Sequence, residues 1–107
     1  MTREDYLRQR LSEGEPDLIA DLYLYGEADG GKTVPISIGF GCPCCADDSL
    51  TEGWDGYPLL EREMMPGDRQ RVGFVFMSGP DAVEALATSD PFYLWEGKII
   101  GEARIVR

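Results

Sequence analysis

Three cysteines stand within four residues, at Cys42, Cys44 and Cys45, and the chain has no others. Thiolates are the ligands that structural zinc prefers, and a carboxylate from Asp47 or Asp48 could complete the set of four. Strong zinc sites pair two separated clusters, however, and the sequence holds one. The acidic neighbours should also raise the pKa of the thiols, which disfavours a reactive thiolate. We expect these cysteines to be structural, with a zinc site or redox thiols on the cluster as the alternative.

Residues 26–33 read GEADGGKT and match the phosphate-binding loop G-x-x-x-x-G-K-T. Such a loop works between a strand and a helix, because the helix N-terminus helps to hold the phosphates. Residues 34–40 instead alternate apolar side chains with smaller or polar ones, which predicts a strand. Glu27 and Asp29 would also place two negative charges where the phosphates should lie. We therefore predict a plain hairpin loop and no bound nucleotide.

Acidic and aromatic side chains gather in the stretch 42–68, which holds seven acids and one base. Their spacing does not match a calcium-binding loop. Acids of this density should speed association with a basic partner, and aromatic side chains dominate the centres of protein interfaces. The predicted partner-binding residues are Asp47, Asp48, Glu52, Trp54, Asp55 and Tyr57. The alternative is that the acids serve solubility alone and that Trp54 packs inward.

Composition excludes several classes of function. The 107 residues suffice for one domain, and 20 acidic against 10 basic side chains give a net charge of −10. That charge argues against nucleic acid and against an anionic membrane surface. The chain has no histidine, so it cannot supply serine–histidine or cysteine–histidine catalysis. We expect a protein that is not an enzyme and that uses no cofactor.

The number of cysteines and the sequence of the N-terminus indicate in which cellular compartment the protein is expected. An odd number of bunched cysteines is not a disulfide framework. Residues 1–6 are charged and no apolar run follows them, so they do not read as a secretory signal, and no stretch approaches the ~20 apolar residues of a membrane helix. The expected location is the cytoplasm.

Thirteen glycines and seven prolines favour short strands joined by turns. Thr2 and Asp5 form a capping box for a helix that Gly14 and Pro16 should end. We predict strands over 18–25, 34–40, 71–76, 92–95 and 99–106, a weaker one over 59–64, helical turns over 81–87, and irregular chain over 41–58. The boundaries are an N-terminal helical extension at 1–16 and a β domain at 17–107.

The core and one turn can be named in advance. The expected core residues are Val34, Ile36, Ile38, Phe74, Phe76, Ile99 and Ile105. The stretch Met65-Pro66-Gly67-Asp68 is typical of a tight turn, in which Gly67 should take a positive φ.

The order of these motifs resembles a known family. The strand at 17–25, the sequence GGKTVPI at 30–36, the turn at 65–68 and GKIIG at 97–101 together look like the third, C-terminal β-barrel domain of elongation factor Tu. The resemblance covers residues 17–107 and implies a six-stranded antiparallel barrel without a nucleotide. In that family the domain helps to hold aminoacyl-tRNA and contacts the GTPase domain and the exchange factor. Residues 39–45 lack the basic side chain that the family carries there, which argues against tRNA binding.

Together these observations predict an all-β, free-standing barrel with a short N-terminal helix. Its expected function is to bind a basic protein, for example a nuclease or a ribosome-associated protein. The competing hypothesis is a metal or redox protein that uses Cys42, Cys44 and Cys45.

Overall fold

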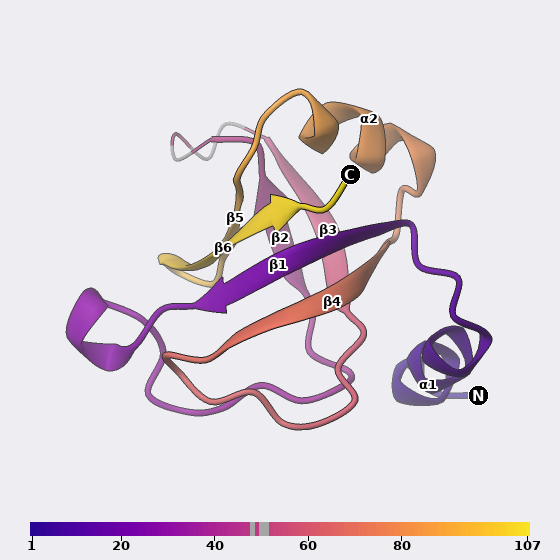
Figure 1. Cartoon of the computed structure of the whole chain (residues 1–107), viewed down its shortest axis with the longest axis horizontal. Helices are drawn as coiled ribbons and strands as arrows, with labels where there is room; N and C mark the ends of the chain where they lie inside the picture. Colours follow the sequence, from indigo (N-terminus) through magenta and orange to yellow (C-terminus); the bar gives the residue numbers. More distant parts are fainter. Residues whose placement is uncertain (48, 50–51) are drawn as a thin grey trace.

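A computed structural model describes residues 1–47, 49 and 52–107, and within them six antiparallel strands close into a barrel in the order β1–β4–β3–β2–β5–β6 (Figure 1). Asp48, one of the predicted partner-binding residues, lies outside the described residues. The strands are β1 (Leu18–Leu24), β2 (Cys42–Cys45), β3 (Gly53–Pro58), β4 (Arg69–Phe76), β5 (Phe92–Trp95) and β6 (Ile99–Ile105). The helices are α1 (Arg3–Glu13), α2 (Pro80–Ala87) and a short 3₁₀ turn at Glu27–Asp29. The predicted all-β class, the six-stranded barrel and the N-terminal helix are confirmed.

The barrel interior follows from alternation along the strands. In β1 the side chains of Ala20, Leu22 and Leu24 are buried, as a period of two requires for one inward face. Phe74 and Phe92 meet edge to face at 5.3 Å in the centre of this core. Helix α2 closes one end, because its Ala82 and Leu86 join the same cluster. Closure leaves no long free strand edge for unspecific pairing.

Residues 34–40 do not form the predicted strand. Only Ile36 pairs, and it exchanges two backbone hydrogen bonds with Met64 at 2.9 and 2.8 Å. Pro35 has no amide to donate, and Gly39 takes a φ of +106°, so the ladder cannot continue on either side. The strand expected at 59–64 is wrong as well, because the segment has only the isolated bridge at Met64 and one further backbone hydrogen bond to another strand, from the Leu59 amide to the Gly73 carbonyl at 2.8 Å.

The stretch predicted as irregular, 41–58, instead supplies β2 and β3. Its glycines and prolines have weak strand propensity, but β2 and β3 pair with each other and each also pairs with a further strand of the barrel, β5 and β4 respectively. Gly56 lies opposite Cys42, and Cys44 lies opposite Trp54. Packing across the pair decides the structure here, and packing is not a local property of the sequence.

The predicted core is correct for four of its residues and wrong for Val34. Ile36, Ile38, Phe74 and Phe76 are buried, whereas Val34 is 54% exposed because its segment is no strand. The structure leaves Ile99 and Ile105 partly buried. The turn at 65–68 is confirmed, with Gly67 at a φ of +96° and its amide donating to the Leu24 carbonyl at 2.7 Å.

Helix α1 lies outside the barrel wall, beside β3 and β4 (Figure 1). The Thr2–Asp5 capping box is present, and Gly14 ends the helix at a φ of +69°. Leu7 packs on Ile38, Leu59 and Val75 in a second, smaller apolar cluster on the outer face of the barrel. An isolated helix of this length is marginal, so docking on the barrel stabilises it, and this apolar contact is one part of that docking.

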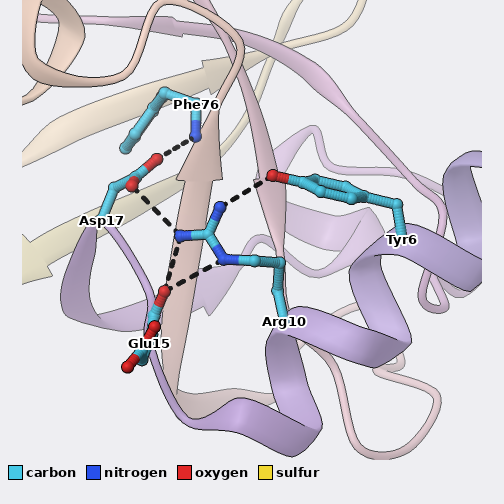
Figure 2. A network of polar contacts seen from close by, with 5 residues as sticks. All are labelled: Tyr6, Arg10, Glu15, Asp17 and Phe76. Carbon is cyan, nitrogen blue, oxygen red and sulfur yellow. Dashed lines mark hydrogen bonds and ion pairs between the residues drawn. The ribbon is translucent and has the colours of Figure 1, made fainter.

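Arg10 ties α1 to the barrel through a polar network (Figure 2). Its guanidinium donates to the Tyr6 hydroxyl at 2.8 Å, to the Glu15 carbonyl at 2.6 and 3.1 Å, and to the Asp17 carboxylate at 3.3 Å. The other oxygen of Asp17 accepts the Phe76 amide at 2.8 Å. One side chain therefore links the helix, the chain leading into β1 and the end of β4.

Candidate functional site

In the loop that matches a phosphate-binding motif, backbone amides already donate hydrogen bonds to carbonyls of the same loop. The amides of Asp29 and Gly31 both donate to the Gly26 carbonyl at 2.9 Å, and the Gly30 amide donates to the Glu27 carbonyl at 3.1 Å. Amide N–H groups that donate to carbonyls within the loop cannot also converge on a phosphate. The chain after the motif is not helical, so the helix N-terminus of a phosphate loop is missing as well.

The predicted hairpin at this loop is wrong in one respect. Strand β1 pairs with β4 and β6, so the loop does not join two neighbouring strands. Lys32, which would face the phosphates, instead forms an ion pair with Glu96 and lies 5.5 Å from the centre of the Phe40 ring.

The three cysteines divide between two environments. Cys42 and Cys44 belong to the barrel core, and the Cys44 thiol donates to the Cys42 carbonyl at 3.7 Å. Cys45 lies on the outer side of β2, in a hollow shared with Pro43 and Trp95. All three are free and buried. Within the described parts of the chain, no three cysteine, aspartate or glutamate side chains are grouped so as to hold a metal ion.

The raised thiol pKa expected from the sequence agrees with the structure, with a different principal cause. The pKa of Cys44 is raised by its contact with Cys42 and by burial, and Asp55 contributes least. Burial raises the pKa of Cys45, followed by the charges of Cys42 and Asp47. A raised pKa disfavours a reactive thiolate at Cys44 and Cys45, which supports the structural interpretation of these two residues.

Strand β3 separates the predicted partner-binding residues into two sets. Trp54 faces inward and packs partly buried against the barrel core, together with Ala46. Asp55 and Tyr57 lie on the outer face, where Asp55 is exposed. Because successive side chains of a strand point to opposite faces, Trp54 and Tyr57 cannot share one surface.

Tyr57 forms one wall of a groove between α1 and the barrel. Its ring lies directly over Gly41, where an added Cβ would come within 2.0 Å of the ring. The Arg3 guanidinium lies 5.0 Å from the ring centre on the α1 side. The groove has a volume of about 500 Å³. Its wall includes Met1, Arg3, Tyr6, Tyr57, Val75 and Met77.

Three apolar side chains of this groove are exposed to solvent, and they were not predicted from the sequence as binding residues. They are Met1 at 89%, Met77 at 71% and Tyr6 at 42%. A signal for Met77 exists in the sequence, because alternation from Phe74 and Phe76 places it on the outer face. Nothing local indicates that α1 would bring Met1 and Tyr6 beside it.

Of the acids predicted as partner-binding, Asp55 lies on the same outer face of β3 as Tyr57, whereas Asp47 and Glu52 lie in the loop between β2 and β3. Asp47, Glu52 and Asp55 are exposed, and none of them forms an ion pair within the described part of the chain. The Ser49 amide donates to Asp47 at 3.0 Å, and hydrogen bonds from Ser49 lower the pKa of Asp47. Asp55 precedes Tyr57 by two residues on the same face, and its carbonyl accepts the Met77 amide at 3.0 Å.

Comparison with known proteins leaves the family open, since no family model matches the chain and no curated protein matches it significantly. The resemblance to the third domain of elongation factor Tu therefore stays a prediction. Among the described residues, neither helix has the length and apolar character to cross a membrane.

Proposed function

We propose that this barrel is a non-enzymatic protein-binding domain, and that its partner is a basic protein with an apolar side chain at the centre of the contact. The observation that carries the proposal is the position of Asp55 and Tyr57. Asp55 is an exposed acid on the same outer face of β3 as Tyr57, and Tyr57 lines a groove whose walls carry the exposed apolar side chains of Met1, Tyr6 and Met77. Contiguous exposed apolar surface marks interaction sites, and an acid beside it favours a basic partner.

The proposed surface keeps part of the residues expected from the sequence. Asp47, Glu52, Asp55 and Tyr57 stay in it, and Trp54 does not, because it packs against the core. A net charge of −10 should raise the rate of association with a basic partner and make that rate fall with salt. The apolar side chains should instead control dissociation, since they would fill the buried centre of the contact.

The predicted likeness to the elongation factor Tu domain supports the same class of function. In that family the barrel contacts other proteins without binding a nucleotide itself. Three free, buried thiols suit a reducing compartment, so the cytoplasm remains the proposed location.

The test compares captures from native cell extract by matched variants. Asp55→Asn and Met77→Ser should lose the protein that the unchanged chain retains, because they remove the charge and the apolar wall. Glu61→Gln and Met65→Ser change an exposed acid and an exposed methionine outside the groove and should retain it. Equal capture by all four variants would reject this surface.

A second measurement addresses the thiol alternative. Protein purified without chelator should contain no stoichiometric zinc, because Cys42 and Cys44 face the barrel core whereas Cys45 lies on the outer side of β2, so the three thiols do not converge. One equivalent of bound zinc, lost together with partner binding in Cys45→Ala, would favour the metal hypothesis instead.

A further inference from the structure

A second surface, formed by the outer faces of β4, β1 and β6, is built from arginine and tyrosine. Strand register sets the side chains in two rows that run across the three strands. In the first row Asp21 lies between Arg71 and Arg104. In the second row Tyr23 lies between Arg69 and Glu102.

The first row is held by an ion pair. Arg71 donates two parallel hydrogen bonds to Asp21, at 2.8 and 3.2 Å. Arg104 lies 3.5 Å from Glu102, a glutamate that also accepts the Tyr25 hydroxyl at 3.0 Å. These contacts orient the guanidinium groups without burying them, so their outer edges still face solvent.

Arg69 differs from the other arginines of this surface. Its guanidinium lies 3.9 Å from the centre of the Tyr23 ring, within the range of a cation–π contact. Among the described residues, no carboxylate lies within ion-pair distance of it. Stacking fixes the plane of the group and leaves its donors free for an acceptor from another molecule.

Tyr23 is itself held in place. Its hydroxyl donates to Asp29 at 3.1 Å, and its ring meets Tyr25 edge to face at 5.3 Å. Side chains fixed in this way lose little conformational entropy when a partner binds. Tyrosine and arginine are also the residue types most enriched where interfaces gain their affinity.

Basic side chains outnumber acidic ones on this side of an acidic protein. A groove of about 380 Å³ is lined by Arg69, Arg71 and Arg104, with Asp21 and Glu102 as its acids. A neighbouring groove of about 420 Å³ is lined by Arg62 together with Arg69 and Arg71, with Glu61 as its acid. Four of the ten basic side chains of the chain therefore share one contiguous surface.

We infer that this arginine surface binds an extended acidic segment of a partner protein. Arg69 and Arg71 stand two residues apart on β4, which places them about 7 Å apart. Arg71 and Arg104 flank β1 and are therefore separated by two strand spacings, about 10 Å. Groups this far apart cannot converge on one phosphate, whereas the spacing of Arg69 and Arg71 matches carboxylates on alternate residues of an extended chain. The inference does not depend on the proposed function, because the two surfaces share no residue and attract opposite charges.

The test uses a fluorescein-labelled decapeptide of alternating glutamate and threonine, with binding followed by anisotropy and by NMR of the labelled protein. We expect saturable binding that shifts the amides of β1, β4 and β6. Arg69→Gln should weaken it about tenfold or more, the effect of losing hydrogen bonds to a charged group. Arg69→Lys keeps the charge and loses the planar stacking, so it should weaken binding to a smaller degree.

Arg8→Gln is the matched control, because Arg8 is an exposed arginine on α1 that pairs with Glu4 at 3.4 Å. It removes the same charge from the protein and should leave peptide affinity unchanged. Equal losses in Arg8→Gln and Arg69→Gln, or no saturable binding, would overturn the inference. Inorganic phosphate that displaces the peptide at equal concentration would also overturn it, in favour of a small-anion site. Melting curves of each variant check that the barrel remains folded.

Discussion

Trp54 and Tyr57 stand three residues apart on β3, and their side chains lie on opposite faces of the strand. Trp54 contacts the barrel core, whereas Tyr57 contacts the apolar cluster beneath α1. The two aromatic residues of the acidic stretch therefore serve different purposes. One stabilises the barrel, and the other forms the wall of a groove.

Trp54→Ala should lower the free energy of unfolding by about 2 kcal/mol, less than for a fully buried tryptophan, because part of its ring is exposed. It should leave the rate of dissociation from the partner unchanged. Urea denaturation measures the first quantity, and surface plasmon resonance with the captured partner measures the second. If the variant has wild-type stability but dissociates faster from the partner, the prediction is wrong and Trp54 belongs to the binding surface.

Gly56→Ala should destabilise the barrel by about 1–3 kcal/mol through overpacking. An added Cβ would lie 2.7 Å from the Cys44 sulfur and 2.7 Å from a ring carbon of Phe76, both in the core. Gly26→Ala is the control, because its nearest neighbour would be 3.8 Å away. Thermal and urea unfolding of the two variants should differ clearly, and equal stabilities would contradict the packing at Gly56.

Asp17→Ala should loosen α1 and the end of β4 together. It removes an acceptor of Arg10 and leaves the Phe76 amide without its hydrogen bond, at a cost of about 1–3 kcal/mol. Hydrogen exchange should then quicken at Phe76 and throughout α1. Glu63→Ala, an exposed acid outside this network, should change neither. Protection that persists in α1 would show that Leu7 holds the helix without the polar network.

Stability should decline as the pH rises above about 9. The folded protein raises the pKa of Cys44 and Cys45 above the ordinary value of 9.0, and burial with a hydrogen bond to Glu102 raises the pKa of Tyr25 from 10.0 to about 12. The unfolded chain therefore loses these protons first, and alkali favours unfolding. Unfolding free energies measured between pH 8 and 11 should fall, with a shallower fall above pH 10 in Tyr25→Phe. A flat profile would contradict the burial of these groups.

Mg–ATP and Mg–GTP should leave the melting temperature unchanged. The amides of the loop at 26–31 bond within the loop, and Lys32 is already paired with Glu96. Differential scanning fluorimetry with either nucleotide tests this directly. A saturable rise in melting temperature that Lys32→Ala abolishes would restore the phosphate-loop interpretation.

Local patterns in the sequence were enough to locate several elements. Alternation in β1 and β4, the capping box at Thr2 and the turn at Gly67 all depend on neighbours within a few residues. Side-chain periodicity and backbone dihedral preferences are local properties, so they can be read from the chain itself. Short strands and glycine-rich turns predicted an antiparallel barrel or sandwich, and the six-stranded barrel was the expectation that the resemblance to the elongation factor Tu domain implied.

Only the tertiary structure decided which segments pair and which side chains meet. Residues 34–40 alternate like a strand, yet the single bridge of Ile36 to Met64 is all that finds a partner. Residues 42–45 and 53–58 are rich in glycine and proline, yet they pair with each other and with β5 and β4 as part of the closed barrel. The groove at Tyr57 and the stacking of Arg69 on Tyr23 join residues distant in sequence or on different strands. Pairing, register and helix docking are chosen by packing across the whole barrel, and that free energy is not contained in any local stretch of the sequence.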